Sequence, residues 1–192
     1  MELETNTATQ HTASSEVPAA PPIVLLLVLF WLSILGHEAA QFGVGALVYS
    51  SDELRTGIVR SWPQLLVVCA GPVFTMLLMT MSVLGARSSQ NATWKLAWSS
   101  LVASAASRIA IVGYGTLRGT AINDEQTIGR ILGMSPRAIW CAEALVAVAC
   151  IVHVARMWSP NVRPQILQWI AVSVVVGWAV TLVAGPLLGL PI

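Results

Sequence analysis

Charged side chains are scarce in this sequence. Of its 192 residues, 10% are Asp, Glu, Lys or Arg, whereas 56% are apolar. A soluble globular domain carries about 25% charged residues, so the composition excludes an ordinary soluble domain. It also excludes a chain that is disordered throughout, because disorder requires low hydrophobicity and high net charge. The formal net charge of +1 gives no basic field for a polyanion, and we expect no nucleic-acid partner.

Cysteine is also rare. The chain has 3 cysteines, and each lies inside an apolar segment rather than in a loop. A disulfide framework of the secreted type normally uses an even number of cysteines. We therefore interpret Cys69, Cys141 and Cys150 as small packing residues.

Long apolar segments are what the sequence has instead. Each is close to the roughly 20 residues that a helix needs to cross the hydrocarbon core of a bilayer. The segments extend from Ile23 to about Tyr49 and over about 63–85, 96–116, 138–157 and 165–190. We therefore predict an all-α fold, a polytopic membrane helix bundle of about five transmembrane helices surrounded by the lipid bilayer.

The chain is predicted to divide into a disordered polar N-terminal tail, residues 1–21, and a membrane domain, residues 22–192. The tail contains no Lys or Arg, whereas a cleaved secretory signal begins with basic residues. The first apolar segment is therefore predicted to remain as a span. Tryptophans are expected at the level of the headgroups, and four of them lie at or near the ends of the apolar segments: Trp62, Trp94, Trp98 and Trp158.

The informative ionisable residues inside the apolar segments are His37, Glu38, Arg108, Glu143 and His153. A charged group at the centre of a bilayer costs at least about 2.5 kcal/mol, so each needs a partner or a function. His37 is about 15 residues into the first span, roughly 22 Å along a helix, and lies inside the membrane. Glu143 and His153 are nearer to the ends of their span, where snorkelling or a packing hydrogen bond explains them.

The segment His37-Glu38-Ala39-Ala40-Gln41 has the spacing of the zinc-binding His-Glu-x-x-His motif. In that motif two imidazoles at i and i+4 hold Zn²⁺, and the Glu is the general base. Gln41 stands at the second position, and its amide oxygen is a neutral and weaker zinc ligand. Two interpretations remain: a zinc site formed by His37 and Gln41 with Glu38 as base, or an intramembrane pair, joined by Arg108, that fixes helix packing.

A second motif, Gly71-Pro72, lies in the second apolar segment. Proline frees a backbone carbonyl, and glycine lets another chain come close, so the helix could open onto a cavity. The alternative is a plain structural kink, because both residues are common in membrane helices.

A third motif is Asn123-Asp124, after the third apolar segment. Asn123 as N-cap, Gln126 in a capping box and Gly133 at the end predict a short surface helix. In a functional interpretation, the carboxylate of Asp124 is instead a metal ligand, which suits zinc chemically.

Together these motifs resemble the site-2-protease-like intramembrane zinc metalloproteases. The order is the same, with His37-Glu38 in the first span, Ala70-Gly71-Pro72 in the second and Asn123-Asp124 after the third. The resemblance covers roughly residues 30–136 and is closest to small bacterial members of the family. It implies an integral membrane protein of the bacterial plasma membrane.

The resemblance also implies a site and a reaction. Zn²⁺ would be held by His37, a second ligand and Asp124, with Glu38 as general base, and the substrate would be a membrane helix cut within or near the bilayer. The sequence departs from the family at two positions. Gln41 stands where the family has its second histidine, and Thr75 stands where many members have an asparagine.

Three functional interpretations follow from these residues. The first is an active or weakly active intramembrane zinc protease. The second is a catalytically dead relative that binds membrane helices as a scaffold or regulator. The third is a small transporter with an intramembrane charge relay made of Glu38, Arg108, Glu143 and His153.

The third apolar segment also carries a packing signal. Ser99, Ala103 and Ser107 recur every four residues, so this face is predicted to meet another helix closely. Arg108 follows directly and is therefore predicted to point into the bundle rather than towards lipid.

Overall fold

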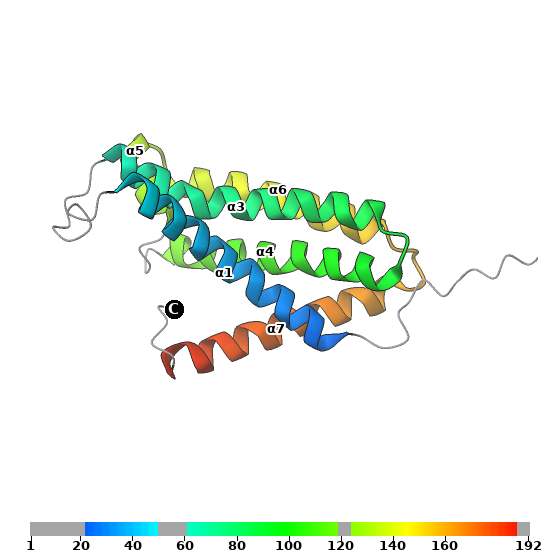
Figure 1. The fold of residues 1–192 in the computed structure, drawn as a ribbon. Coiled ribbons are helices and arrows are strands. Elements are labelled where there is room, and N and C mark those ends of the chain that lie inside the picture. Colours follow the sequence, from blue (N-terminus) through cyan, green and yellow to red (C-terminus); the bar gives the residue numbers. More distant parts are fainter. Residues whose placement is uncertain (1–21, 50–60, 119–123, 188–192) are drawn as a thin grey trace, which may run out of the picture.

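A computed structural model describes residues 22–49, 61–118 and 124–187 of the chain (Figure 1). Over these residues the protein is helical, with short turns. The helices are α1 (Ile23–Val48), α3 (Ser61–Ser88), α4 (Ala92–Arg118), α5 (Asp124–Leu132), α6 (Pro136–Arg156) and α7 (Arg163–Leu187). All except α5 are long and apolar enough to cross a membrane, which confirms the predicted all-α fold with five spans. The predicted disorder of residues 1–21 lies outside the described residues.

Helix α4 is the centre of the bundle. It packs against α1, α3, α6 and α7, and Figure 1 shows it between these helices. About 61% of its spanning stretch is buried, against 11–28% in the other four spans. Small Ser and Ala side chains are frequent along α4, and they let four neighbours approach its backbone.

The predicted small-residue face of α4 is in contact with tryptophans. The indole Nε1 of Trp158 donates to Ser99 Oγ at 3.2 Å, and that of Trp178 in α7 donates to Ser107 Oγ at 2.9 Å. Ala103 of the same face packs beside Trp158 and α7. The prediction that this face meets other parts of the bundle is therefore confirmed.

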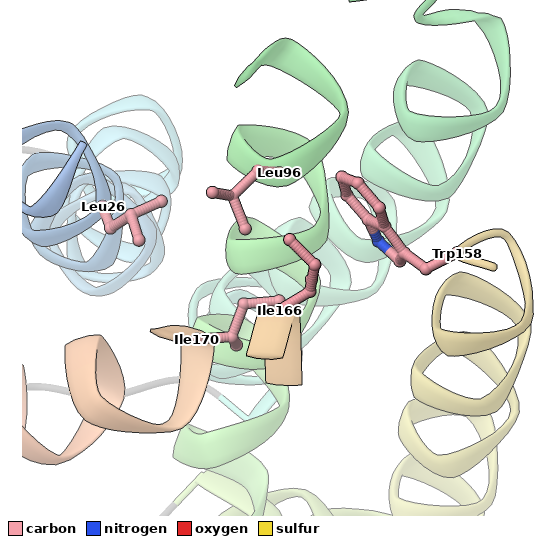
Figure 2. Packing of buried hydrophobic residues seen from close by; sticks show 5 residues of the cluster. All are labelled: Leu26, Leu96, Trp158, Ile166 and Ile170. Atoms are coloured by element: carbon pink, nitrogen blue, oxygen red, sulfur yellow. The ribbon is translucent and has the colours of Figure 1, made fainter. Parts of the chain in front are cut away.

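Trp158 packs against other parts of the bundle. Its side chain is buried in the turn between α6 and α7 (Figure 2). The cluster around it contains Leu26 of α1, Leu96 of α4, and Ile166 and Ile170 of α7. Trp158 is therefore a packing residue, because the turn folds its indole inwards, while Trp62 and Trp94 are exposed at their helix ends.

Helix α5 is short and does not span the membrane. It packs against α3 and α6, and Figure 1 shows it at one end of the bundle. It ends at Gly133, whose φ of 67° places it in the left-handed region that favours glycine. The predicted short helix is therefore confirmed, whereas the predicted N-cap, Asn123, lies outside the described residues. The three cysteines are free; Cys69 and Cys150 are half-buried, but Cys141 is exposed, so the packing role expected of Cys141 is not found.

Candidate functional site

His37 lies on the inner face of α1 and is completely buried. It follows Phe30 and Ser33 at helical spacing, so the three share one face. The imidazole packs directly against Gly71 of α3, where a Cβ atom would overlap the ring. Helix α3 continues through Pro72 as one helix. The expected close approach of another helix is therefore found at Gly71, whereas neither an opening of the helix onto a cavity nor a kink is shown at this motif.

Thr75, one turn after Gly71 on α3, orients the imidazole of His37. The hydroxyl of Thr75 donates its hydrogen to the Gly71 carbonyl at 3.1 Å. Its Oγ1 lies 2.9 Å from His37 Nδ1 and must therefore accept a hydrogen bond from that nitrogen. We assign a hydrogen to His37 Nδ1 on this pattern, whereas Nε2, the ring atom nearest to Gly71, is left for the other partners of the ring.

Asp124 meets His37 on this other side of the ring. It is the first residue of α5, and its Oδ2 lies 3.0 Å from His37 Nε2, although the residues are 87 positions apart in the sequence. The Asp124 side chain is 19% exposed. Asp124 and His37, two of the zinc ligands that the resemblance implies, therefore lie next to each other.

Arg108 of α4 closes the cluster. Its Nη2 contacts His37 Nε2 and lies 3.4 Å from Asp124 Oδ2, so one guanidinium nitrogen faces both atoms. The side chain is only 16% exposed. The prediction that Arg108 points into the bundle is confirmed.

Gln41 is one turn after His37 on α1 and reaches the same point. Its amide Nε2 lies 3.4 Å from His37 Nε2, so the NH₂ group rather than the oxygen faces the ring. The amide also donates towards the Asp124 carboxylate. The guanidinium and the amide thus both reach the point where His37 Nε2 and the Asp124 carboxylate meet. We refer to His37, Gln41, Arg108 and Asp124 as the polar cluster.

The pKa of Asp124 reflects this arrangement. Burial alone would raise the pKa, but hydrogen bonding to His37, the positive charge of Arg108 and hydrogen bonding to Gln41 together lower it below its ordinary value. Asp124 is therefore a carboxylate at neutral pH. Together with the guanidinium it makes the polar cluster electrically neutral.

Glu38 lies outside the polar cluster. It is exposed on α1 and lines an open groove of about 380 Å³ whose other walls are Gln41, Phe42, Gly45, Ala46, Tyr49 and Val67. Gln41 therefore belongs to both the groove and the polar cluster. Among the described residues, no hydrogen bond or ion pair involves the Glu38 carboxylate.

Glu125 is a buried acid that the sequence analysis did not single out. Its side chain is 1% exposed, and neither carboxylate oxygen meets a hydrogen-bond partner among the described residues. Burial and the negative charge of Asp124 raise its pKa, and the carboxyl of Glu143 on α6 also interacts with it. Its burial could have been suspected from the sequence, because Glu125 and Ile128 are three residues apart and therefore share one face of α5, the inner one.

The raised pKa of Glu125 predicts the effect of Glu125→Gln. The unfolded chain loses this proton at a lower pH than the folded chain, so the buried acid reduces stability as pH rises above its ordinary pKa of 4.5. In thermal unfolding in detergent, Glu125→Gln should match the wild type near pH 4. At pH 8 it should be more stable than the wild type, because the neutral amide carries no charge in the buried site. An equal difference at both pH values would contradict this.

The four residues of the suggested charge relay are not assembled into one path. Glu143 and Arg108 both act on Glu125 electrostatically. His153, ten residues after Glu143 on α6, is exposed, and so is Glu38. The structure therefore gives no support to a relay through all four residues.

The donor set of the polar cluster fits a divalent metal in part. His37 offers an oriented nitrogen and Asp124 a carboxylate, and both are zinc ligands. Within the described ranges, no three His, Cys, Asp or Glu side chains come together, so the third ligand would have to be Gln41. Its amide nitrogen now faces the imidazole, and zinc would need the oxygen. Neither a protein-family model nor a curated protein nor a solved structure matches the chain.

Proposed function

We propose that this polytopic membrane protein is a site-2-protease-like intramembrane zinc metalloprotease of weak activity. In this proposal His37, Asp124 and Gln41 are the ligands of Zn²⁺ and Glu38 is the general base. The observation that carries it is the 3.0 Å approach of His37 Nε2 and Asp124 Oδ2 from helices far apart in the sequence. These are the two strong ligands that the resemblance implies.

The surroundings of His37 support this proposal. A metal-binding histidine usually donates its second ring N–H to a fixed acceptor, which sets the tautomer and the direction of the free nitrogen. Thr75 provides this acceptor, held in turn by the Gly71 carbonyl. Thr75, a departure from the family pattern, thus has a role in orienting the proposed ligand.

The groove supports a role for Glu38. When bound, zinc lowers the pKa of a water molecule and polarises a peptide carbonyl. Glu38 is next to His37 in sequence, and its carboxylate lies in the groove that Gln41 also lines. There it would accept a proton from water and return it to the departing amine. The apolar groove residues, such as Phe42 and Val67, would contact a membrane helix as substrate.

Zinc binding by the purified full-length protein tests the ligand set. We expect wild type to bind Zn²⁺ weakly, and Asp124→Asn to bind it at least about 10-fold more weakly, because a neutral amide replaces the carboxylate. Glu38→Gln should leave zinc affinity unchanged and abolish cleavage of a transmembrane test peptide. Isothermal titration and peptide cleavage in detergent micelles measure the two effects. Equal zinc affinity of Asp124→Asn and wild type would refute Asp124 as a ligand.

A second candidate function is the catalytically dead relative, which binds membrane helices without cutting them. Gln41 favours it, because its amide presents a donor and not a ligand atom to the polar cluster. In this case Glu38→Gln would change helix association or stability and not turnover. A wild type that binds a transmembrane peptide but shows no cleavage with saturating zinc would support it.

A further inference from the structure

We propose that Arg108 is an internal cation that occupies the metal position of the polar cluster, so that the guanidinium and a divalent metal exclude each other. This inference rests on the proposed function and adds a regulation of the same site. Without metal, Arg108 keeps His37 and Asp124 in place. A metal ion enters only when Arg108 moves away.

The contacts of one atom carry this inference. Arg108 Nη2 faces Nε2 of His37 and the Oδ2 atom of Asp124, the two atoms that would bind the metal. These two atoms lie 3.0 Å apart, while Nδ1 of the same ring is bound to Thr75. Because Nε2 and Oδ2 converge on one position, a single cation at that position contacts both. Arg108 supplies one from α4, a helix that contributes no candidate ligand.

Charge balance leads to the same conclusion. Arg108 and Asp124 are neutral as a pair, and both are largely buried, with 16% and 19% of their side chains exposed. A divalent ion added beside the guanidinium would leave a net charge of +2 in a poorly hydrated site, where like charges a few ångströms apart repel strongly. Arginine does not lose its proton in proteins, so it cannot relieve this repulsion by titration. It has to move out of contact.

A purely structural ion pair is the competing explanation. In that case Arg108 stabilises the fold by pairing with Asp124, and its removal destabilises the protein whether or not metal is present. The two explanations differ in the response to metal. If Arg108 holds the metal position, a metal ion can replace it, whereas a structural pair has no such substitute.

The experiment compares Co²⁺ and Zn²⁺ binding by wild type, Arg108→Met and Arg108→Lys in metal-stripped full-length protein. Co²⁺ reports histidine coordination by its visible absorption, and thermal unfolding gives a second readout that needs no activity. Arg130→Met is the matched control, because it removes an arginine from the exposed face of α5 without touching the polar cluster. Arg108→Lys keeps the charge and covers the case in which Arg108→Met fails to fold.

Arg108→Met should bind Co²⁺ about 100-fold more tightly than wild type, the scale expected for a unit charge a few ångströms from a divalent ion. Arg108→Lys should fall between them, and Arg130→Met should behave as wild type. Metal-free Arg108→Met should unfold at a lower temperature than wild type, and Zn²⁺ should restore it.

Two results would overturn the inference in distinguishable ways. Equal metal affinity of wild type and Arg108→Met would refute the exclusion by Arg108 and leave the proposed zinc site intact. Absence of binding in wild type, Arg108→Met and Arg108→Met combined with Gln41→His would refute the zinc site itself, and the exclusion with it. In that second case Arg108 is a structural partner of Asp124.

Discussion

Gly71→Ala is expected to destabilise the protein and to displace His37. The added Cβ atom would overlap the imidazole, which is completely buried and is held on its other sides by Thr75, Asp124 and Arg108. Overpacking of a close contact costs typically about 1–3 kcal/mol. Here the ring must also give up hydrogen bonds inside the protein, so we expect the upper end of this range. Thermal unfolding of the variant in detergent measures the loss.

Gly43→Ala is the matched control for this prediction. Gly43 is also within a membrane-spanning helix, α1, but a Cβ atom there would have no neighbour within 4 Å. Alanine is favoured over glycine in a helix interior by roughly 1 kcal/mol, so this variant should be neutral or slightly more stable. A Gly71→Ala protein as stable as Gly43→Ala would show that α1 and α3 do not approach each other as described.

The helices could be predicted from the sequence because apolar length alone decides whether a segment spans a bilayer. The predicted segments at 23–49 and 96–116 differ from α1 and α4 by a few residues at their ends. The inward position of Arg108 was also predictable, since a lipid-facing arginine is costly and the small-residue face beside it marks a helix contact. The spacing of small residues and the free-energy cost of an arginine facing lipid depend on one segment alone, so both can be read from the sequence.

The contacts within the polar cluster were only partly predictable. The i and i+4 spacing places Gln41 near His37, but it does not tell that the amide nitrogen faces the ring. The guanidinium of Arg108 between His37 and Asp124 depends on how α4 packs against α1 and α5, which no local pattern specifies. In the sequence, Thr75 stood out only as a departure from a family pattern. That its hydroxyl orients His37 could not be predicted from the sequence.

The burial of Glu125 is another feature that depends on tertiary packing. Acidic residues in the first turn of a short helix usually face water, where they interact well with the helix dipole. Glu125 is instead buried, because α5 packs against α3 and α6 on the face that also carries Ile128. The burial of a whole helix face is a tertiary property, so the capping signals predicted the helix correctly and the environment of its second residue incorrectly.

Gln41→His is expected to have the largest effect on metal binding. The side chain at this position already reaches the polar cluster, with its amide nitrogen 3.4 Å from His37 Nε2. An imidazole there would add a third strong ligand to His37 and Asp124 and complete the usual set of a catalytic zinc site. Zinc affinity should rise by about 100-fold or more, since loss of an outer-shell partner alone changes affinity 10–100-fold.

Isothermal titration of Zn²⁺ into metal-stripped protein measures this gain, with Phe42→His as the matched control. That variant adds an imidazole to the same helix at i+5 from His37, roughly 140° around the helix axis. The Phe42 side chain is 80% exposed in the wild type, so the new imidazole would point away from the polar cluster. It should bind Zn²⁺ no better than wild type. If Gln41→His folds and binds as weakly as Phe42→His, even in an Arg108→Met background, His37 and Asp124 do not form a metal site. The polar cluster is then an ion pair that joins α1, α4 and α5 within the membrane, because a fold can be kept after its chemistry is lost.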